Sequence, residues 1–345
     1  MKKLFLSLVV AMIATVSFAQ NILVATVSHG EDVSMYYGTY ALRDAMNAAQ
    51  SGDIINLSGG AFQATNITKA VTLRGTGIDD AAPTYITGYY TINIPADDAN
   101  RLSMEGIRCT GIITMKGTFN NPCFMKSQFY QFSYNDDPTI KNAMFVDCRI
   151  SSYYKLTGTS TVQFVNSYVN SFNNSDATNT AASFINCVIT PCKNYNSSNG
   201  NISCPQYIRN AQLLNSIIYH DYSLTPSQSY QLPNSSVATN CISIGYSNLF
   251  GAQAANTGNR SFSYNEFSKV FKSFTGSYSE AQQFELTDEA KTKYLGTDGT
   301  EVGMHGGVLP YDTTPSYPQI TKMNVANKTT ADGKLSVEIE VSAAE

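Results

Sequence analysis

Phe164-Val-Asn-Ser167 and Phe184-Ile-Asn-Cys187 are two copies of a four-residue motif that decides the fold of this chain. The motif has an apolar first position, a polar third position and a small fourth position, and it recurs as Phe124-Met-Lys-Ser127, Phe145-Val-Asp-Cys148, Leu213-Leu-Asn-Ser216 and Ala238-Thr-Asn-Cys241. Successive third positions are 21, 19, 20, 29 and 25 residues apart, which is the length of one supersecondary unit. The sequence therefore predicts a repeat protein.

The polar and small positions of the motif indicate a parallel β-helix. A column of Ser and Cys tolerates no bulk, as expected where stacked segments turn sharply around a narrow interior. Asparagine suits such a bend because it tolerates positive φ, and stacked amides can hydrogen-bond from rung to rung in an asparagine ladder. Coils of about 20 residues with Val, Ile and Phe inside are typical of this fold. Extending both columns backward to Arg74-Gly75 and Glu105-Gly106 gives eight rungs.

Three segments resemble right-handed parallel β-helix proteins of the pectin-lyase-like superfamily. Residues 40–57 look like the capping helix and first strand of that superfamily, and residues 71–77 look like its next strand and turn. Residues 295–307 are similar to the last turn of many secreted bacterial β-helix proteins. In the first segment, one apolar face at helical spacing can cover the open end of the coil: Leu42, Ala45, Met46 and Ala49.

The predicted fold is all-β: a right-handed single-stranded parallel β-helix with an N-terminal capping helix and a short C-terminal β tail. The tail contains two predicted strands at 319–326 and 334–341, which we expect to dock on the β-helix or on a partner. Helix-like or irregular patterns at 263–274 and 280–293 are expected to pack over the C-terminal end of the coil.

The N-terminus, residues 1–19, is predicted to be a secretory signal peptide. A basic start is followed by a short apolar run and by a small-residue pattern typical of cleavage before Gln20. The run is too short to span a bilayer, and no later run approaches about 18 apolar residues, so we expect no membrane insertion. The β-helix domain is then predicted at 20–311, and a linker with the β tail at 312–345. We expect secretion to the periplasm, the cell surface or the extracellular medium.

Composition limits the partners and the covalent links. Without the two lysines of the signal peptide, 20 basic residues stand against 26 acidic ones, a net charge near −6, which makes nucleic acid a poor partner. Of the seven cysteines, three occupy the small column and are interpreted as buried packing residues: Cys148, Cys187 and Cys241. Cys192 and Cys204 flank a polar loop and are one candidate disulfide, and Cys109 with Cys123 is a second.

The late coils are lengthened at 190–212 and 219–236, and such loops usually build the binding surface of a solenoid. They are rich in Asn, Ser and Tyr, which suit sugar recognition because aromatic faces stack on pyranose rings while amides bond hydroxyls. The alternative is that polar β-rich loops simply contain these residue types. Candidate ligand-binding residues are Tyr153, Tyr168, Tyr195, Tyr207, Tyr219 and Tyr222.

The leading functional hypothesis is a non-catalytic envelope or surface protein that binds a polysaccharide or a surface protein and needs no cofactor. The rival is a polysaccharide lyase or glycoside hydrolase acting on acidic polysaccharide. The resemblance implies that such a lyase holds calcium with carboxylates and uses Arg or Lys as base. The candidate catalytic residues are then Arg149, Asp147 and Lys126.

Two features of the sequence favour the non-catalytic interpretation. The column beside Arg149 reads Gln128, Arg149, Tyr168 and Val188, and it lacks the cluster of acids that would hold calcium, so no metal site is predicted. The charges of the polar column also alternate in sign, so the column can simply neutralise itself: Arg74, Glu105, Lys126 and Asp147.

Overall fold

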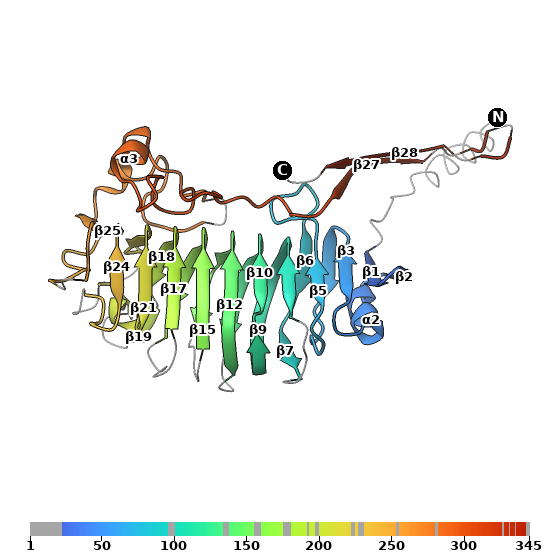
Figure 1. The fold of residues 1–345 in the computed structure, drawn as a ribbon, viewed down its shortest axis with the longest axis horizontal. Helices are drawn as coiled ribbons and strands as arrows, with labels where there is room; N and C mark the ends of the chain where they lie inside the picture. Colours follow the sequence, from blue (N-terminus) through green and yellow to red (C-terminus); the bar gives the residue numbers. More distant parts are fainter. Residues whose placement is uncertain are drawn as a thin grey trace, which may run out of the picture.

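The computed structural model describes residues 23–95, 101–133, 138–154, 160–174, 181–191, 193–196, 200–221, 225–226, 231–252, 255–279, 282–325, 328–330, 332–334 and 336–342. The predicted signal peptide, Cys192 and Tyr222 lie outside these residues. The described residues form a mostly parallel β-solenoid of about eight turns with few helices, which confirms the predicted fold class (Figure 1). No helix among them is long and apolar enough to cross a membrane.

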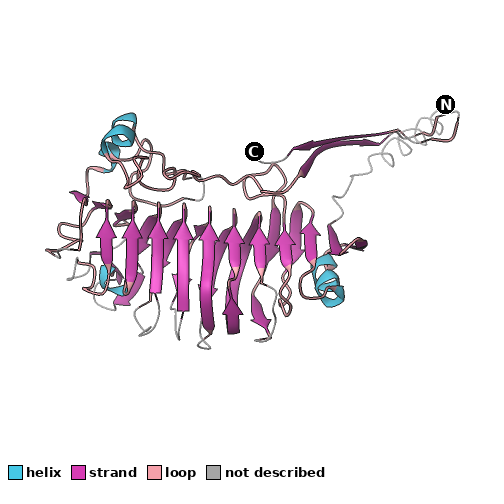
Figure 2. Ribbon diagram, viewed as in Figure 1, coloured by secondary structure: helices cyan, strands magenta, loops and turns pink. Residues whose placement is uncertain are grey.

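Each turn adds strands to two long parallel sheets, and Figure 2 shows the row of strands along the rod. Sheet A consists of β3 (Ile54–Leu57), β5 (Thr72–Arg74), β8 (Ser103–Glu105), β10 (Cys123–Met125), β12 (Thr139–Val146), β15 (Ser160–Val165), β17 (Ala181–Ile185), β21 (Ala211–Leu214) and β24 (Val237–Thr239). Sheet B consists of β4 (Gly60–Gln63), β6 (Thr84–Thr87), β9 (Ile107–Asn120), β11 (Gln128–Ser133), β13 (Arg149–Ile150), β16 (Tyr168–Phe172), β18 (Val188–Pro191), β22 (Ile217–Tyr219), β25 (Ile242–Ile244) and β26 (Arg260–Phe262). Two more strands extend sheet B, namely β7 (Tyr90–Ile94) and β14 (Tyr153–Tyr154).

The two sheets meet at a corner residue with a left-handed backbone. Its φ lies between 46° and 54° at the polar positions of the motif: Lys126, Asp147, Asn166, Asn186, Asn215 and Asn240. Gly106, with φ 70°, occupies this corner one turn earlier, because Glu105 pairs with Met125. The backward extension of the columns was therefore wrong by one residue, and Arg74 and Glu105 lie just before the corner. Glycine and asparagine adopt positive φ at the least cost, so either fits.

The apolar positions of the motif stack into an aromatic column inside the solenoid. The rings of Phe124, Phe145, Phe164 and Phe184 follow one another with centroids 4.6, 5.1 and 4.9 Å apart and nearly parallel planes. The small positions are also fully buried, and they hydrogen-bond to the backbone. Ser167 Oγ, for example, accepts from the Cys148 N–H at 3.0 Å and donates to the Val165 carbonyl at 2.7 Å. Both columns confirm the predicted packing.

The structure separates the packing cysteines from the candidate disulfides. Cys148, Cys187 and Cys241 are at most 1% exposed, as expected for the small column. The candidate bridge between Cys109 and Cys123 is wrong, because both thiols are unbridged and Cys109 Sγ lies 3.3 Å from the Tyr90 hydroxyl. Cys204 was predicted to pair with Cys192. Cys192 lies outside the described residues, so that disulfide stays a prediction.

Replacing Cys187 by serine is expected to change the free energy of unfolding by no more than about 1 kcal/mol. Serine fills the same position in the neighbouring turns, at Ser167 and Ser216. Cys187→Leu is the contrasting variant, and its extra volume should cost about 1–3 kcal/mol. Urea titration with and without reductant measures both changes. A Cys187→Ser loss as large as that of Cys187→Leu, or a loss that depends on reductant, would contradict a role in packing.

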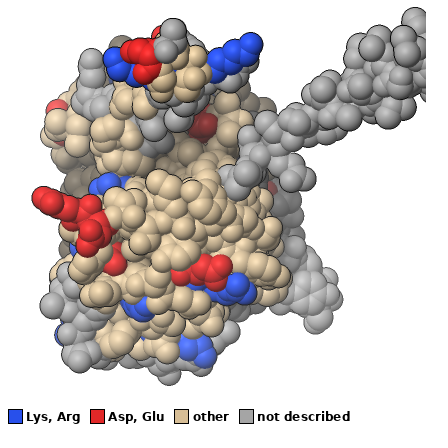
Figure 3. All heavy atoms as spheres, turned by 90° about the vertical axis from the view of Figure 1, so that its right-hand side faces the viewer, with Lys and Arg blue, Asp and Glu red and all other residues tan. Residues whose placement is uncertain are grey.

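The N-terminal end of the solenoid is capped as predicted. Helix α2 (Ala41–Ala48) buries its apolar face against the first turn through Ala41, Leu42, Ala45 and Met46. Strand β1 (Val24–His29) pairs antiparallel with β3 and with β2 (Asp32–Tyr37). Figure 3 views this end, where the described acidic and basic side chains are scattered among uncharged ones.

The C-terminal β tail forms the predicted antiparallel pair, β27 (Gln319–Val325) with β28 (Val337–Ser342). Figure 1 shows this hairpin extending away from the solenoid, although docking on it was one expectation. A second small sheet belongs to the lengthened late coils and contains β19 (Lys193–Asn196), β20 (Gly200–Ser203) and β23 (Thr225–Pro226). A short 3-10 helix, η1 (Pro205–Tyr207), follows β20.

The segment after β26 covers the side of the solenoid rather than its C-terminal end. It contains η2 (Phe267–Lys269) and α3 (Asp288–Lys293). Outward side chains of sheet B, among them Tyr168, Val188, Ile217 and Tyr219, form one buried cluster with Phe267, Val270, Phe271, Phe274, Phe284 and Leu286. The reason is the strand pattern, because these turns carry apolar residues on both faces of sheet B and the outer face needs a cover.

Residues 295–317, here called the strap, run along the corner column back toward the N-terminal end of the solenoid (Figure 1). Asn215 contacts Thr297, and Lys126 contacts Asp312 at 2.8 Å. Closer still to the N-terminal end, the ring of Tyr317 packs on the guanidinium of Arg74. The first residues of the predicted linker are thus bound to the solenoid. The amides of Asn166 and Asn215 bond to the strap and not, as predicted for an asparagine ladder, to the next asparagine.

Candidate functional site

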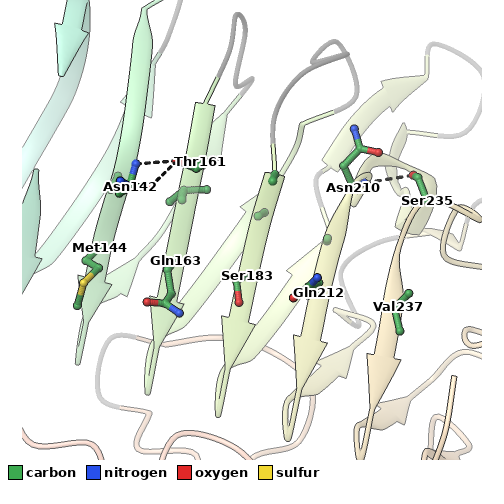
Figure 4. Close-up of a pocket in the computed structure, with 14 residues that line it drawn as sticks. Asn142, Met144, Thr161, Gln163, Ser183, Asn210, Gln212, Ser235 and Val237 are labelled. Atoms are coloured by element: carbon green, nitrogen blue, oxygen red, sulfur yellow. Dashed lines mark hydrogen bonds between the residues drawn. The ribbon is translucent and has the colours of Figure 1, made fainter. Parts of the chain in front are cut away.

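A groove of about 550 Å³ lies on the outer face of sheet A and crosses β12, β15, β17, β21 and β24 (Figure 4). Two rows of side chains line it. The first row follows the strand register and contains Met144, Gln163, Ser183, Gln212 and Val237. The second row contains Asn142, Thr161, Ala181, Asn210 and Ser235. Because it crosses successive strands, the groove runs along the axis of the rod.

Small side chains at the centre make the groove hollow. Ala181 and Ser183 on β17 lie between the longer Gln163 of β15 and Gln212 of β21. Strand pairing fixes the distance between neighbouring side chains of a row at about 4.8 Å. The backbone N–H and C=O groups of these strands bond to one another within the sheet, so a ligand in the groove meets side chains.

The groove is uncharged, and its amides and hydroxyls lie among a larger apolar surface. Thr161 Oγ1 donates to Asn142 Oδ1 at 3.2 Å, and the N–H of Asn210 donates to Ser235 Oγ at 3.2 Å (Figure 4). Side-chain amides and hydroxyls both donate and accept hydrogen bonds. The residues that line the groove include no Asp, Glu, Lys, Arg or His. Its chemistry therefore suits a ligand that has both hydroxyl groups and apolar faces and carries no net charge.

The groove begins in the regular turns and reaches the edge of the lengthened ones, because Asn210, Gln212 and Ser235 belong to the segments 190–212 and 219–236 that the sequence favoured. A sequence signal for it exists in the residue immediately before the first position of the motif. Because side chains alternate along a strand, that residue points outward when the motif residue points inward. This place is held by Met144, Gln163, Ser183, Gln212 and Val237.

Arg149, the predicted base of the lyase alternative, is buried on the outer face of sheet B. Its side chain is 4% exposed, and its guanidinium donates to both carboxylate oxygens of Asp79, at 3.3 and 3.2 Å. The ring of Tyr311 from the strap lies 5.6 Å from this guanidinium, and Gln283 accepts a hydrogen bond at 3.3 Å. An external substrate would reach Arg149 only if these C-terminal residues moved away.

Asp147 and Lys126, the other two candidate catalytic residues, lie in the corner column beside the strap. Lys126 is paired with Asp312. Asp147 is 7% exposed, and burial raises its pKa to about 7 although the charge of Lys126 opposes this rise. Its Oδ1 atom is buried without a hydrogen-bond partner in the described structure. None of the three candidates lines the groove.

The candidate tyrosines are in different environments. Tyr168 and Tyr219 are 0% exposed and hydrogen-bond to each other at 3.0 Å beneath the C-terminal aromatic cluster. Their prediction as ligand-binding residues was wrong, because the outer face of sheet B is covered. Tyr207 is half-buried on η1, while Tyr153 and Tyr195 belong to the short strands β14 and β19. Tyr222 lies outside the described residues.

No cluster of three or more His, Cys, Asp or Glu that could hold a metal ion occurs in the part of the chain that the structure describes. Comparison of the chain with protein-family models, with curated proteins and with solved structures finds no match. The groove on sheet A is therefore the feature that points most directly to a ligand.

Proposed function

We propose that this chain is an exported, non-catalytic protein of the cell envelope or surface that binds an uncharged polysaccharide along the groove of sheet A. Export is supported by the N-terminal pattern that precedes Gln20. Kinship with the pectin-lyase-like β-helices is supported by the resemblances at 40–57 and 295–307. Binding of this kind needs no cofactor.

The observation that carries the proposal is the uncharged groove across five parallel strands, which is lined by amides, hydroxyls and apolar side chains. A row of outward side chains repeats about every 4.8 Å along it, so an extended polymer meets an equivalent position at each strand. Gln163, Ser183 and Gln212 offer amides and a hydroxyl to sugar hydroxyls, while Ala181 offers a small apolar surface. A linear chain of hydroxylated rings matches both the direction and the chemistry of the groove.

A polysaccharide fits this groove better than a surface protein, the other predicted partner. An extended peptide usually adds to a sheet through the free backbone groups of an edge strand. The strands under the groove are paired on both sides, from β15 to β21. Protein interfaces also favour aromatic and Arg anchors, and the residues that line the groove include neither.

Filling the groove is expected to weaken polysaccharide binding at least about tenfold. Ser183→Tyr places a ring in the hollow, and the double variant Gln163→Ala with Gln212→Ala removes the flanking amides. Calorimetric titration of the full chain with neutral and acidic polysaccharides of matched length measures the affinity. The neutral polymers are expected to bind, and the acidic ones should bind with no higher affinity than the neutral ones.

Thr72→Tyr is the matched control for this experiment. Thr72 is half-buried like Ser183 and holds the same outward row, but it lies on β5 near the N-terminal end and outside the groove. The control should bind as the wild type does. Equal binding by Ser183→Tyr and Thr72→Tyr, or binding to none of the neutral polymers, would refute a ligand site in the groove.

The enzymatic alternative predicts a different result when the same protein is incubated with polysaccharides. A lyase would cleave polyuronates and leave unsaturated sugar ends that absorb ultraviolet light. This activity would require calcium and would disappear in Arg149→Ala. Such a product would overturn the non-catalytic proposal. Affinity for a neutral polymer without any product supports it.

A further inference from the structure

A second hollow, of about 430 Å³, lies on the outer face of β7, β9 and β11. Tyr90, Ile113 and Phe132 are paired neighbours on these strands, and all three belong to the buried core. Because side chains alternate along a strand, the residues before and after each of them point outward, and these residues line the hollow. The hollow shares no residue with the groove of sheet A.

The outward residues form two rows of different character. The first row is largely apolar and contains Tyr89, Ile112 and Gln131. The second row is polar and contains Asn66, Thr91, Thr114 and Ser133. The residues that line the hollow include no Asp, Glu, Lys, Arg or His. The hollow therefore presents an apolar side and a side of hydroxyls and amides, which suits a ligand without charge.

The polar row can bond the hydroxyl groups of a ligand. Thr91 and Thr114 are half-buried, and neither hydroxyl bonds to another residue in the part of the chain that the structure describes. Asn66 Oδ1 accepts the N–H of Thr91 at 2.9 Å, which orients this amide beside the row. Successive strands are about 4.8 Å apart, so the row from Asn66 to Ser133 extends about 14 Å, which is longer than one sugar ring.

Tyr89 places an exposed aromatic ring on a rigid turn. The residue is 77% exposed, and Gly88 before it has a φ of 107°. Gly111 of the next turn packs directly on this backbone, because a Cβ atom there would collide with the Gly88 carbonyl oxygen and would lie 3.0 Å from the Tyr89 nitrogen. A ring on a backbone that is fixed in advance loses little freedom on binding, and it can pack on the apolar face of a sugar.

We infer that this hollow binds a short uncharged oligosaccharide. Tyr89 packs on the apolar face of a sugar ring, while Thr91 and Thr114 bond hydroxyl groups at the edge of the sugar. The site is separate from the groove and does not depend on polysaccharide binding there. A solenoid with both sites holds glycan on two of its faces.

Tyr89→Trp gives a direct reporter of this site, because the chain contains no tryptophan. Tryptophan keeps the aromatic surface, so the full chain should still bind, and its fluorescence should change on titration with at least one neutral trisaccharide. The neutral probes are cellotriose, laminaritriose, maltotriose and triacetylchitotriose, and trigalacturonate is the acidic comparison. Val308→Trp is the matched control and should not respond, because Val308 is 89% exposed in the strap, next to Gly307, which contacts Asn186 several turns away.

Two further variants test the two rows of the hollow. Thr114→Val in the Tyr89→Trp protein should weaken binding at least about fivefold. Thr118→Val, at a half-buried position of the same strand outside the hollow, should leave binding unchanged. Tyr89→Ala should weaken binding of the same sugar about tenfold in calorimetric titration, with an unchanged unfolding temperature because the side chain is exposed.

The inference would be overturned if no neutral probe changed the fluorescence of Tyr89→Trp up to about 10 mM, or if Val308→Trp responded equally. Tighter binding of trigalacturonate than of every neutral probe, or equal effects of Thr114→Val and Thr118→Val, would also overturn it. The fluorescence reports this hollow alone, so the result does not depend on whether the groove of sheet A binds a polysaccharide.

Discussion

Replacing Asn166 by aspartate is expected to lower the free energy of unfolding by about 4 kcal/mol and to release the strap. Asn166 is 3% exposed, and its side-chain nitrogen donates to the carbonyls of Met304 at 2.8 Å and Gly306 at 2.7 Å. Aspartate keeps the size of the side chain, but it turns a carboxylate oxygen toward two carbonyl oxygens. Because the site is buried, water compensates neither the lost hydrogen bonds nor the charge.

Urea titration measures the change in free energy, and limited proteolysis measures release of the strap. Asn142→Asp is the matched control, since Asn142 also has a positive φ, 54°, but is exposed and does not contact the strap. It should cost less than about 1 kcal/mol. Equal destabilisation by Asn166→Asp and Asn142→Asp would show that this amide does not hold the strap.

The reverse replacement at the neighbouring corner, Asp147→Asn, is expected to stabilise the protein by about 3 kcal/mol above pH 7. Asp147 is buried, and burial raises its pKa from the ordinary 3.8 to about 7. Asparagine removes the carboxyl group while retaining the side-chain shape and the tolerance of positive φ. The corner positions of the later turns are asparagines from Asn166 onward, so Asp147→Asn extends this run by one turn.

The sign of the pH dependence follows from the raised pKa of Asp147. Between about pH 4 and 7 the unfolded chain has released this proton, while the folded protein still holds it. The stability that Asp147 contributes is therefore complete below about pH 4 and is lost as the pH rises to about 7. The gain from Asp147→Asn should accordingly be small at pH 4, grow through this interval and stay constant above it.

Other groups also make the stability depend on pH, so the effect of Asp147 is isolated only by the difference in free energy of unfolding between Asp147→Asn and the wild type. His220 acts in the opposite direction, because burial lowers its pKa from 6.5 to about 4 and its contribution is lost as the pH falls through that interval. Urea titrations of both proteins from pH 4 to 8 give the difference at each pH. Asp44→Asn, at a half-buried position of α2, is the control and should change the free energy of unfolding by less than about 1 kcal/mol. A flat difference for Asp147→Asn would contradict a buried carboxyl group with a raised pKa.

Most of the fold could be predicted from the sequence because its periodicity is local. Each turn repeats the apolar, polar and small positions within four residues, and each position has one physical role. The stacked ring of Phe164, the corner at Asn166 and the buried thiol of Cys187 follow from their residue types. The one-residue error at Glu105 arose because glycine also fits the left-handed corner, so the column could be aligned in two ways.

The candidate site was less predictable because exposure of a strand residue depends on what covers its sheet. Tyr168 and Gln163 both point outward from their strands, yet Tyr168 lies beneath the C-terminal cluster whereas Gln163 lines the open groove. The cover comes from residues about a hundred positions later in the chain. No local pattern near either residue reveals it.

The sequence by itself determined the solenoid, its capping helix, its aromatic and small columns and the antiparallel tail, since these depend on neighbours along the chain or one turn away. The tertiary structure decided which outer faces stay open and where the polar corner residues bond. Asn166 finds its partners 138 and 140 residues away, in a strap whose own sequence carries no repeat. Contacts of that range depend on where the folded chain returns, and periodicity does not encode that return.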